Sequence, residues 1–143
     1  MTITHMTAAH VPQIAALEKE LFTDAWSERS IASELENDLA LWLVALDGEI
    51  VVGYIGSQTV LGEADMLNLA VAPGYRRRGL GRNLIQELIS RLDAHRLTLE
   101  VRISNESARR LYESMGFVQV GLRRNYYEKP REDALILRKE WEK

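Results

Sequence analysis

The stretch LAVAPGYRRRGLGRNLI, residues 69–85, decides the fold of this 143-residue chain. It begins as an apolar strand that Pro73 and Gly74 bring to an end. Three arginines and two glycines follow, and an amphipathic helix begins directly after them. The apolar stripe of that helix has helical spacing and consists of Leu80, Leu84, Ile85, Leu88, Ile89 and Leu92. The stretch therefore predicts a strand, a positively charged turn and a helix in direct succession.

The turn at residues 76–81 has the composition of a phosphate site. A helix N-terminus presents unpaired backbone N–H groups and a partial positive charge. Glycine lets the backbone approach an anion, and arginine adds fork-shaped donors. We interpret the turn as a pyrophosphate site, although arginines that only solvate a turn fit the pattern equally well. A nucleoside-triphosphate loop is excluded by Arg82 and Asn83, and a dinucleotide fingerprint is excluded by Leu84.

Before this stretch we expect two helices and then three antiparallel strands. The first helix spans residues 10–22, with His10 as its cap and Pro12 in its first turn. Ser27 caps a short second helix. The three strands, at residues 39–46, 49–60 and 65–71, are joined by turns at Asp47-Gly48 and Leu61-Gly62.

After the stretch, strands and helices alternate. Residues 97–103 alternate between apolar and polar, which predicts a strand. A helix follows at residues 105–116, with Gly116 as its C-terminal stop. Two last strands, at 117–122 and 133–141, flank a polar loop at 123–132. We therefore expect a single domain, residues 1–143, with an α/β fold whose central sheet is mixed, mostly antiparallel and flanked by helices.

Composition excludes several classes of function. The chain has no cysteine, which excludes disulfides, thiolate metal sites and cysteine nucleophiles. Its three histidines, His5, His10 and His95, do not have the spacing of metal ligands. The net charge of −3 disfavours non-specific binding to nucleic acid. The N-terminus lacks a signal-peptide pattern and the longest apolar run, residues 39–46, is too short to cross a bilayer, so we expect a cytoplasmic protein.

Three segments resemble a known family. RRRGLG, residues 76–81, matches the acetyl-coenzyme A motif of the GNAT acyltransferases. LEVRISNESARRLYESMGF, residues 99–117, and RRNYYEKPREDALIL, residues 123–137, resemble the RimI-type branch of that family. This branch acetylates the N-terminal alanine of small-subunit ribosomal protein eighteen. The resemblance implies acetyl-coenzyme A as cosubstrate, no metal, a ribosomal protein N-terminus as substrate, and neither nucleic acid nor membrane as partner.

The resemblance also assigns the residues that hold the cofactor. The turn residues Arg76, Arg77, Arg78, Gly79, Leu80 and Gly81 would bind the pyrophosphate. The pantetheine arm would pair with Leu69, Ala70 and Val71, and a backbone N–H of this strand would stabilise the oxyanion. Asn105 would touch the cofactor, and as the first residue of a helix it can also be a cap.

Acetyl transfer needs a neutral amine and an acid for the leaving thiolate. With ordinary pKa values of about 8 and about 10.4, deprotonation at pH 7 costs about 1.4 kcal/mol for an α-amine and about 4.6 kcal/mol for lysine. One carboxylate is a sufficient base for an α-amine. The resemblance assigns Glu100 as that base and Tyr112 as the acid. From the residues alone, a solvated strand residue is the favoured interpretation of Glu100, and a core residue is the favoured interpretation of Tyr112.

For the acceptor side we predict that Trp26, in the segment FTDAW, and the loop residues Tyr126 and Tyr127 close over the peptide end. The tyrosines can instead cover the edge of the sheet. Three other functions stay open. They are a broader N-terminal or lysine acetyltransferase, a non-catalytic regulator that binds acyl-coenzyme A, and an RNA-binding module.

Overall fold

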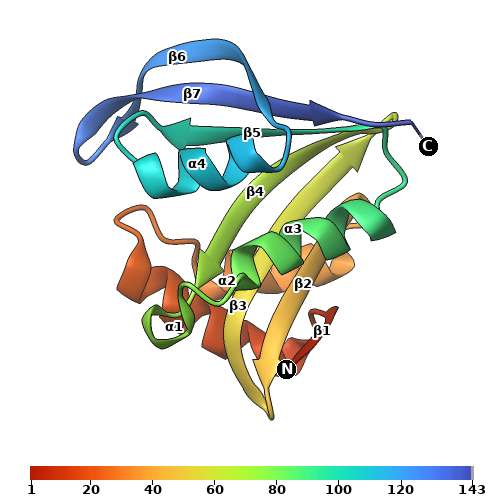
Figure 1. The fold of residues 1–143 in the computed structure, drawn as a ribbon. Coiled ribbons are helices and arrows are strands. Elements are labelled where there is room, and N and C mark those ends of the chain that lie inside the picture. Colours follow the sequence, from red (N-terminus) through yellow and green to blue (C-terminus); the bar gives the residue numbers. More distant parts are fainter. Residues whose placement is uncertain (143) are drawn as a thin grey trace.

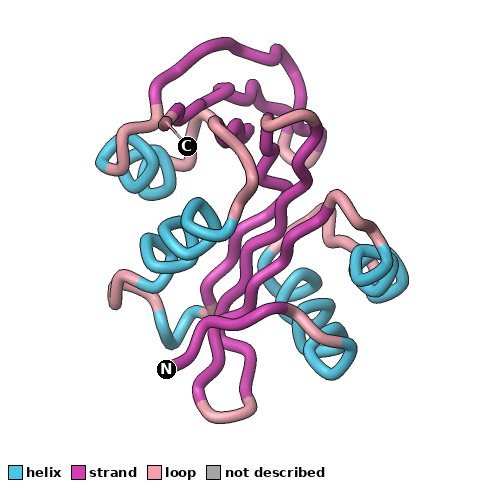
Figure 2. Tube along the Cα trace, turned by 90° about the vertical axis from the view of Figure 1, so that its right-hand side faces the viewer, coloured by secondary structure: helices cyan, strands magenta, loops and turns pink. Residues whose placement is uncertain are grey.

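The computed structural model describes residues 1–142 and contains a seven-stranded sheet with helices on both faces (Figures 1 and 2). The strand order is β1-β2-β3-β4-β5-β7-β6, and only the β4–β5 pair is parallel. The predicted mixed, mostly antiparallel α/β sheet is confirmed. The strands are β1 (Thr2–His5), β2 (Ala40–Asp47), β3 (Ile50–Val60), β4 (Glu63–Val71), β5 (Arg96–Arg102), β6 (Val118–Glu128) and β7 (Arg131–Glu140). The helices are α1 (Val11–Leu21), α2 (Glu28–Ser33), α3 (Leu80–Arg91) and α4 (Glu106–Ser114), with short 3-10 turns at Ala8–His10, Glu34–Glu36 and Pro73–Tyr75.

Two apolar layers attach the helices to the sheet. On one face, α1 and α2 bury Ile14 and Ile31 against the sheet residue Tyr54. On the other face, α3 and α4 pack through Leu84 and Tyr112. Full burial of one large aliphatic side chain stabilises a fold by about 1.5–3 kcal/mol, so these contacts outweigh the weak local propensities of the short helices. Figure 2 shows the helices on the two sides of the twisted sheet.

The residues at which the helices begin can be explained by capping residues and turns in the nearby sequence. Ser27 Oγ accepts the N–H of Ser30 at 3.0 Å, and Asn105 Oδ1 accepts the N–H of Ala108 at 3.3 Å. The helix α3 begins at Leu80, as predicted. His10 is the N-cap residue of α1, as predicted, but its side chain does not bond the helix, because its Nδ1 instead accepts the N–H of Thr7 at 3.0 Å. The imidazole thus closes the turn that precedes α1.

Two predictions about the strands are corrected. The strand β1 was not expected, because four residues carry too little periodicity to signal a strand. The expected loop at residues 123–132 is mostly strand, since β6 continues to Glu128 and β7 begins at Arg131. A bulge with Asn125 at φ 53° accommodates the polar residues, and Asp133 Oδ1 accepts the N–H of Asn125 at 2.8 Å. Pairing with β7 therefore overrides the loop-like composition.

The parallel pair β4–β5 is joined only at one end. Glu63, Ala64 and Asp65 pair with residues 96–98, and beyond them the two strands diverge, as Figure 1 shows. The register of β4 against β3 shifts between Asn68 and Met66, which leaves Leu67 as an extra residue. Such a bulge bends its strand and increases the local twist. The bend directs β4 away from β5 and opens a split in the middle of the sheet.

Gly56 lies on β3, opposite Asn68 of β4. Among the glycines it leaves the least space for an added Cβ atom. An added Cβ would lie 2.6 Å from ring atoms of Trp42, which is itself buried. We expect Gly56→Ala to lower the free energy of unfolding by about 1–3 kcal/mol, measured by urea denaturation. The control is Gly74→Ala, because a Cβ there would meet nothing within 4 Å. Equal stability of both variants would contradict this prediction.

Candidate active site

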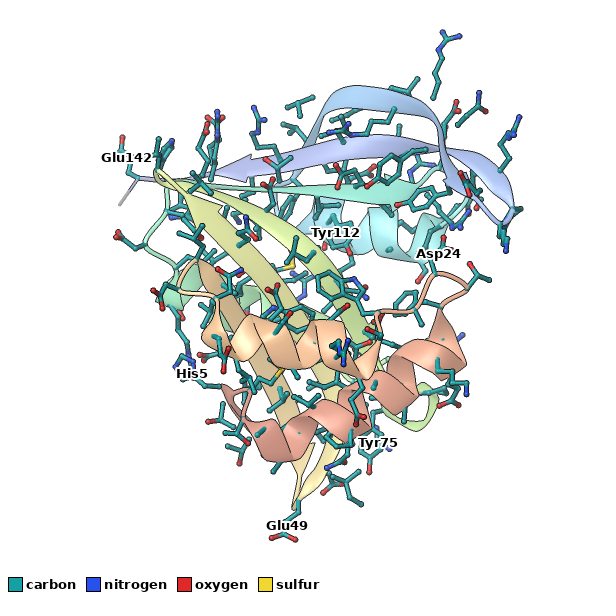
Figure 3. All side chains as sticks on the ribbon, turned by 180° about the vertical axis from the view of Figure 1, so that it is seen from behind. His5, Asp24, Glu49, Tyr75, Tyr112 and Glu142 are labelled. Carbon is teal, nitrogen blue, oxygen red and sulfur yellow. The ribbon has the colours of Figure 1, made fainter. Side chains whose placement is uncertain are left out.

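A cavity of about 730 Å³ lies in the split, at the end where β4 and β5 have separated. Its walls come from the α1–α2 connection, β4, β5, α4 and the β6–β7 hairpin. Figure 3 shows two of the lining residues, Tyr112 and Asp24, between and beside the diverging strands. Five parts of the chain therefore meet at one opening that the sheet topology creates.

The cavity brings together only part of the predicted site. The predicted residues that line it are Trp26, Leu69, Glu100, Asn105, Tyr112, Tyr126 and Tyr127. The predicted residues that do not line it are Ala70, Val71, Arg76, Arg77, Arg78, Gly79, Leu80 and Gly81. The side chains of Ala70 and Leu80 are buried in the two cores, so neither side chain is available to a ligand. The acid–base candidates and the aromatic residues thus share one space, and the phosphate turn lies outside it.

Glu100 occupies the middle of β5. Its neighbours Leu99 and Val101 are buried in the core, so strand alternation turns Glu100 to the opposite face, toward the cavity. Its Oε1 forms an ion pair with Nε of Arg123 at 3.2 Å, and the Arg123 side chain is 54% exposed. The carboxylate is therefore held near the cavity by a partner that faces solvent.

Tyr112 is the buried phenol of the cavity, and Tyr127 is a half-buried one. Tyr112 is only 7% exposed and packs against the ring of Phe117 with centroids 5.7 Å apart. Burial, and secondarily Tyr127, raises the pKa of Tyr112 above its ordinary value. Burial, followed by the neighbouring Tyr126 and Glu100, raises the pKa of Tyr127 to about 12. Both phenols are therefore protonated at neutral pH and can act as donors.

Glu18 is a buried carboxylate next to the cavity that the sequence analysis missed. It is 1% exposed and accepts the N–H of Trp26 at 2.9 Å, the hydroxyl of Tyr54 and the side-chain amide of Asn68. Burial raises the pKa of Glu18, and the hydrogen bonds from Tyr54 and Trp26 oppose that rise. Its position four residues after Ile14, on the apolar face of α1, was the available signal. This carboxylate ties the end of the α1–α2 connection to β3 and β4.

The edge of β4 faces the split through alternate residues. The N–H of Ala72 donates to the Val52 carbonyl on β3 at 2.8 Å, so alternation turns the N–H of Val71, and that of Leu69, toward the split. The N–H of Leu69 donates to Asn68 Oδ1 at 3.0 Å. An extended ligand arm can therefore meet β4 as a neighbouring strand would.

The turn before α3 leaves space for an anion. Gly79 is the N-cap at φ 75°, and a Cβ there would meet nothing within 4 Å. Arg77 has φ 64°, a conformation that is uncommon for a residue other than glycine. Arg76 Nε donates to the Val71 carbonyl at 3.2 Å, which folds the turn back onto the end of β4. The exposed arginines and the helix N-terminus lie on the same turn.

The cavity also contains residues that the sequence did not single out. Thr23 and Asp24 come from the α1–α2 connection, Arg102 from β5, and Lys129 and Pro130 from the β6–β7 turn. Their proximity depends on the hairpin pairing and on the split, which have no local sequence signal. Within residues 1–142, no group of three or more His, Asp or Glu residues could hold a metal ion, and no helix is long and apolar enough to span a membrane.

Comparison with known proteins agrees with this geometry. The model of the acetyltransferase (GNAT) family matches residues 11–117. The chain belongs to the GNAT acetyltransferase family. The [ribosomal protein bS18]-alanine N-acetyltransferase of Escherichia coli K12 is 38% identical over 141 residues, which are 95% of each chain. The N-alpha-acetyltransferase RimI of Mycobacterium tuberculosis is 36% identical, over 98% of this chain and 92% of that protein.

The solved structures include the same relative. The crystal structure of the ribosomal-protein-S18-alanine N-acetyltransferase from Escherichia coli superposes with a TM-score of 0.89. It is 36% identical and covers 99% of this chain and 94% of its own. As a GNAT protein the chain is an acetyltransferase that uses acetyl-CoA. The α3 N-terminus and the open edge of β4 fit such a ligand, because one offers N–H groups and arginines and the other an unpaired strand edge.

Proposed function

We propose that this protein transfers the acetyl group of acetyl-CoA to the α-amine of an N-terminal alanine, and that the acceptor is the small-subunit ribosomal protein bS18. The observation that carries the proposal is the cavity in the split, which joins a carboxylate, a buried and a half-buried phenol, and an aromatic wall. Relatives at 36–38% identity over most of the chain, with names that state N-terminal acetylation, support this acceptor. In this proposal residues 1–143 act as one catalytic unit.

The cofactor is held from two directions. Acetyl-CoA supplies the acetyl group as an activated thioester. We assign its pyrophosphate to Arg76, Arg77, Arg78, Gly79, Leu80 and Gly81, chiefly to their backbone N–H groups at the start of α3. Its arm pairs with Leu69, Ala70 and Val71, where one strand N–H stabilises the oxyanion, and it touches Asn105 at the start of α4.

Glu100 and Tyr112 divide the proton transfers. Glu100 takes the proton from the attacking α-amine, directly or through a water. Tyr112 gives its proton to the departing thiolate, since burial keeps the phenol protonated. Removal of water from the closed cavity strengthens both interactions. The two groups come from β5 and α4, which the chain connects by three residues, 103–105, so their separation is set by a short and capped connection.

The aromatic wall binds the acceptor. Trp26 is fixed through its N–H by Glu18 and packs edge-on against Trp42 with ring centroids 5.4 Å apart. Tyr126 and Tyr127 lie edge to face at 5.0 Å on β6. Rigid aromatic groups of this kind bind a peptide end at little cost in conformational entropy. We assign Trp26, Tyr126 and Tyr127 to recognition of the first residues of the acceptor.

The test compares two peptides with purified protein and acetyl-CoA. One carries the free N-terminal residues of bS18, and the other has a blocked N-terminus and an internal lysine. We expect free thiol to appear and the peptide mass to rise only with the first peptide. A third peptide, identical to the first but already acetylated, is the control. Acetylation of the lysine peptide at a similar rate would instead support a broader acetyltransferase.

The non-catalytic regulator makes a different prediction. It requires that acetyl-CoA bind while neither peptide releases thiol. The protonated phenol and the carboxylate in one cavity argue against that outcome, because a binding protein needs neither. The RNA-binding alternative is disfavoured by the net charge of −3 and is tested by a gel shift at varied salt concentration.

A further inference from the structure

Arg102 lies two residues after Glu100 on β5 and reaches the turn between β6 and β7. Its Nη1 donates to the Pro130 carbonyl at 2.9 Å, and its Nη2 donates to the Lys129 carbonyl at 3.2 Å. The side chain is 23% exposed. A planar guanidinium group that donates hydrogen bonds to two successive carbonyls determines both the position and the orientation of that turn.

The same guanidinium also orients an aromatic residue of the acceptor wall. It lies over the ring of Tyr127 at 4.2 Å from the centroid. Its Nη1 also contacts Glu132 Oε2 at 3.3 Å, and Glu132 Oε1 accepts the N–H of Ser104 at 2.6 Å. Arg102 therefore links three parts of the cavity wall: the hairpin turn, the ring of Tyr127 and the connection between β5 and α4.

The turn held by Arg102 is also joined to the opposite side of the cavity. Thr23 Oγ1, in the α1–α2 connection, donates to the same Lys129 carbonyl at 3.1 Å. One carbonyl thus accepts from residues that are far apart in the sequence. The two segments bridge the cavity at this point, because Thr23, Lys129 and Pro130 all line it.

We propose that Arg102 is a positioning residue for the acceptor, which sets the distance between the β6–β7 turn and the α1–α2 connection and holds the ring of Tyr127 against the bound peptide end. It does not touch the reacting atoms. The proposal rests on the proposed function, since it concerns the peptide that Tyr127 and Trp26 would bind. Lysine cannot replace this residue, because an ammonium group keeps the charge but cannot bond two carbonyls and stack on a ring together.

The test is Arg102→Lys, with steady-state kinetics for both substrates. We expect the KM of the alanine peptide to rise about tenfold, since small displacements of positioning groups have effects of this order. We expect kcat to change by less than about threefold, because uniform loss of substrate binding leaves the chemical step intact. The KM of acetyl-CoA should stay the same, since the contacts of Arg102 lie on the acceptor side.

A second variant tests the shared carbonyl independently. Thr23→Val removes the other hydrogen bond to Lys129 and should raise the peptide KM in the same direction. Because both residues act through one turn, the double variant should show less than the product of the two single effects. The control is Arg138→Lys, since Arg138 bonds Thr98 on the same sheet at 3.0 Å and does not line the cavity.

The outcomes separate this inference from the proposed function. Failure of the wild-type protein to acetylate the alanine peptide sinks the proposed function. If the wild type is active, an unchanged peptide KM in Arg102→Lys overturns the positioning role. A parallel change in kcat, in both KM values and in Tm would also overturn it, because a general loss of structure has that signature. Full additivity with Thr23→Val would refute the coupling through Lys129.

Discussion

Replacement of Glu100 by glutamine should lower kcat by about 10³-fold, within the range usually observed when a general base is removed. Glutamine keeps the size of the side chain and its place on β5, but its amide cannot take a proton from the amine. The fold should persist, because the core neighbours Leu99 and Val101 are unaffected. The measurement is thiol release with the alanine peptide at saturating acetyl-CoA.

The ion pair between Glu100 and Arg123 does not prevent this role. Arg123 is more than half exposed, and an exposed pair of this kind contributes only about 0–1 kcal/mol. The arginine can therefore move away at little cost when an amine approaches. The matched control is Glu63→Gln, which removes a carboxylate paired with Arg96 at the closed end of the same two strands. We expect that control to retain the wild-type kcat.

Two outcomes would contradict the assignment of Glu100. If Glu100→Gln kept more than about a tenth of the wild-type kcat, the amine would lose its proton to another group, since a true base contributes at least about 10²-fold. If Glu63→Gln lost as much as Glu100→Gln, the effect would come from the overall charge of the sheet. Either result would leave the fold and the use of acetyl-CoA unchanged.

Local signals in the sequence predicted the parts of the fold that local physics determines. The stripe of α3 needs only helical spacing, and the caps at Ser27 and Asn105 need only one side chain and a nearby N–H. The turn at residues 76–81 before α3 was predictable for the same reason, and its binding of phosphate stays a prediction. By contrast, the pairing of β6 with β7 depends on contacts between residues distant in the chain. Arg123 and Tyr127 pair with β7 there, and the N–H of Asn125 in the bulge between them is satisfied by Asp133 Oδ1 of that partner strand.

The sequence predicted only those residues of the candidate site that belong to a recognisable motif. Glu100 and Tyr112 could be singled out from a family motif, and the cavity contains both. Glu18 could not, because a helix glutamate is usually solvated and nothing local indicates that Tyr54 and Asn68 will meet it. The same holds for Arg102, whose partners Lys129 and Pro130 approach only after the hairpin forms. Residues that organise a site through several elements do not reveal their partners in the sequence.

Tyr112→Phe should lower kcat by about 10²-fold, at the lower end of the range for loss of a general acid. The substitution removes only a hydroxyl, and the ring keeps its contact with Phe117, so the free energy of unfolding should change little. Because burial raises the pKa of Tyr112, the acid form persists as the pH rises. Wild-type kcat should therefore show no loss from this group up to about pH 10, the ordinary pKa of tyrosine.

The raised pKa of Tyr112 alone would oppose its role, since a phenol is already a weaker acid than a thiol by about 1.5 pKa units. The same burial acts on the leaving thiolate, however, because low polarity disfavours every anion in the cavity. Both pKa values rise together, so burial of the phenol does not by itself widen the gap between them. If Tyr112→Phe kept more than about a third of wild-type kcat, well above the loss expected for a general acid, the thiolate would leave unaided. If Tyr127→Phe caused the larger loss, the acid would be Tyr127, the half-buried phenol of the cavity.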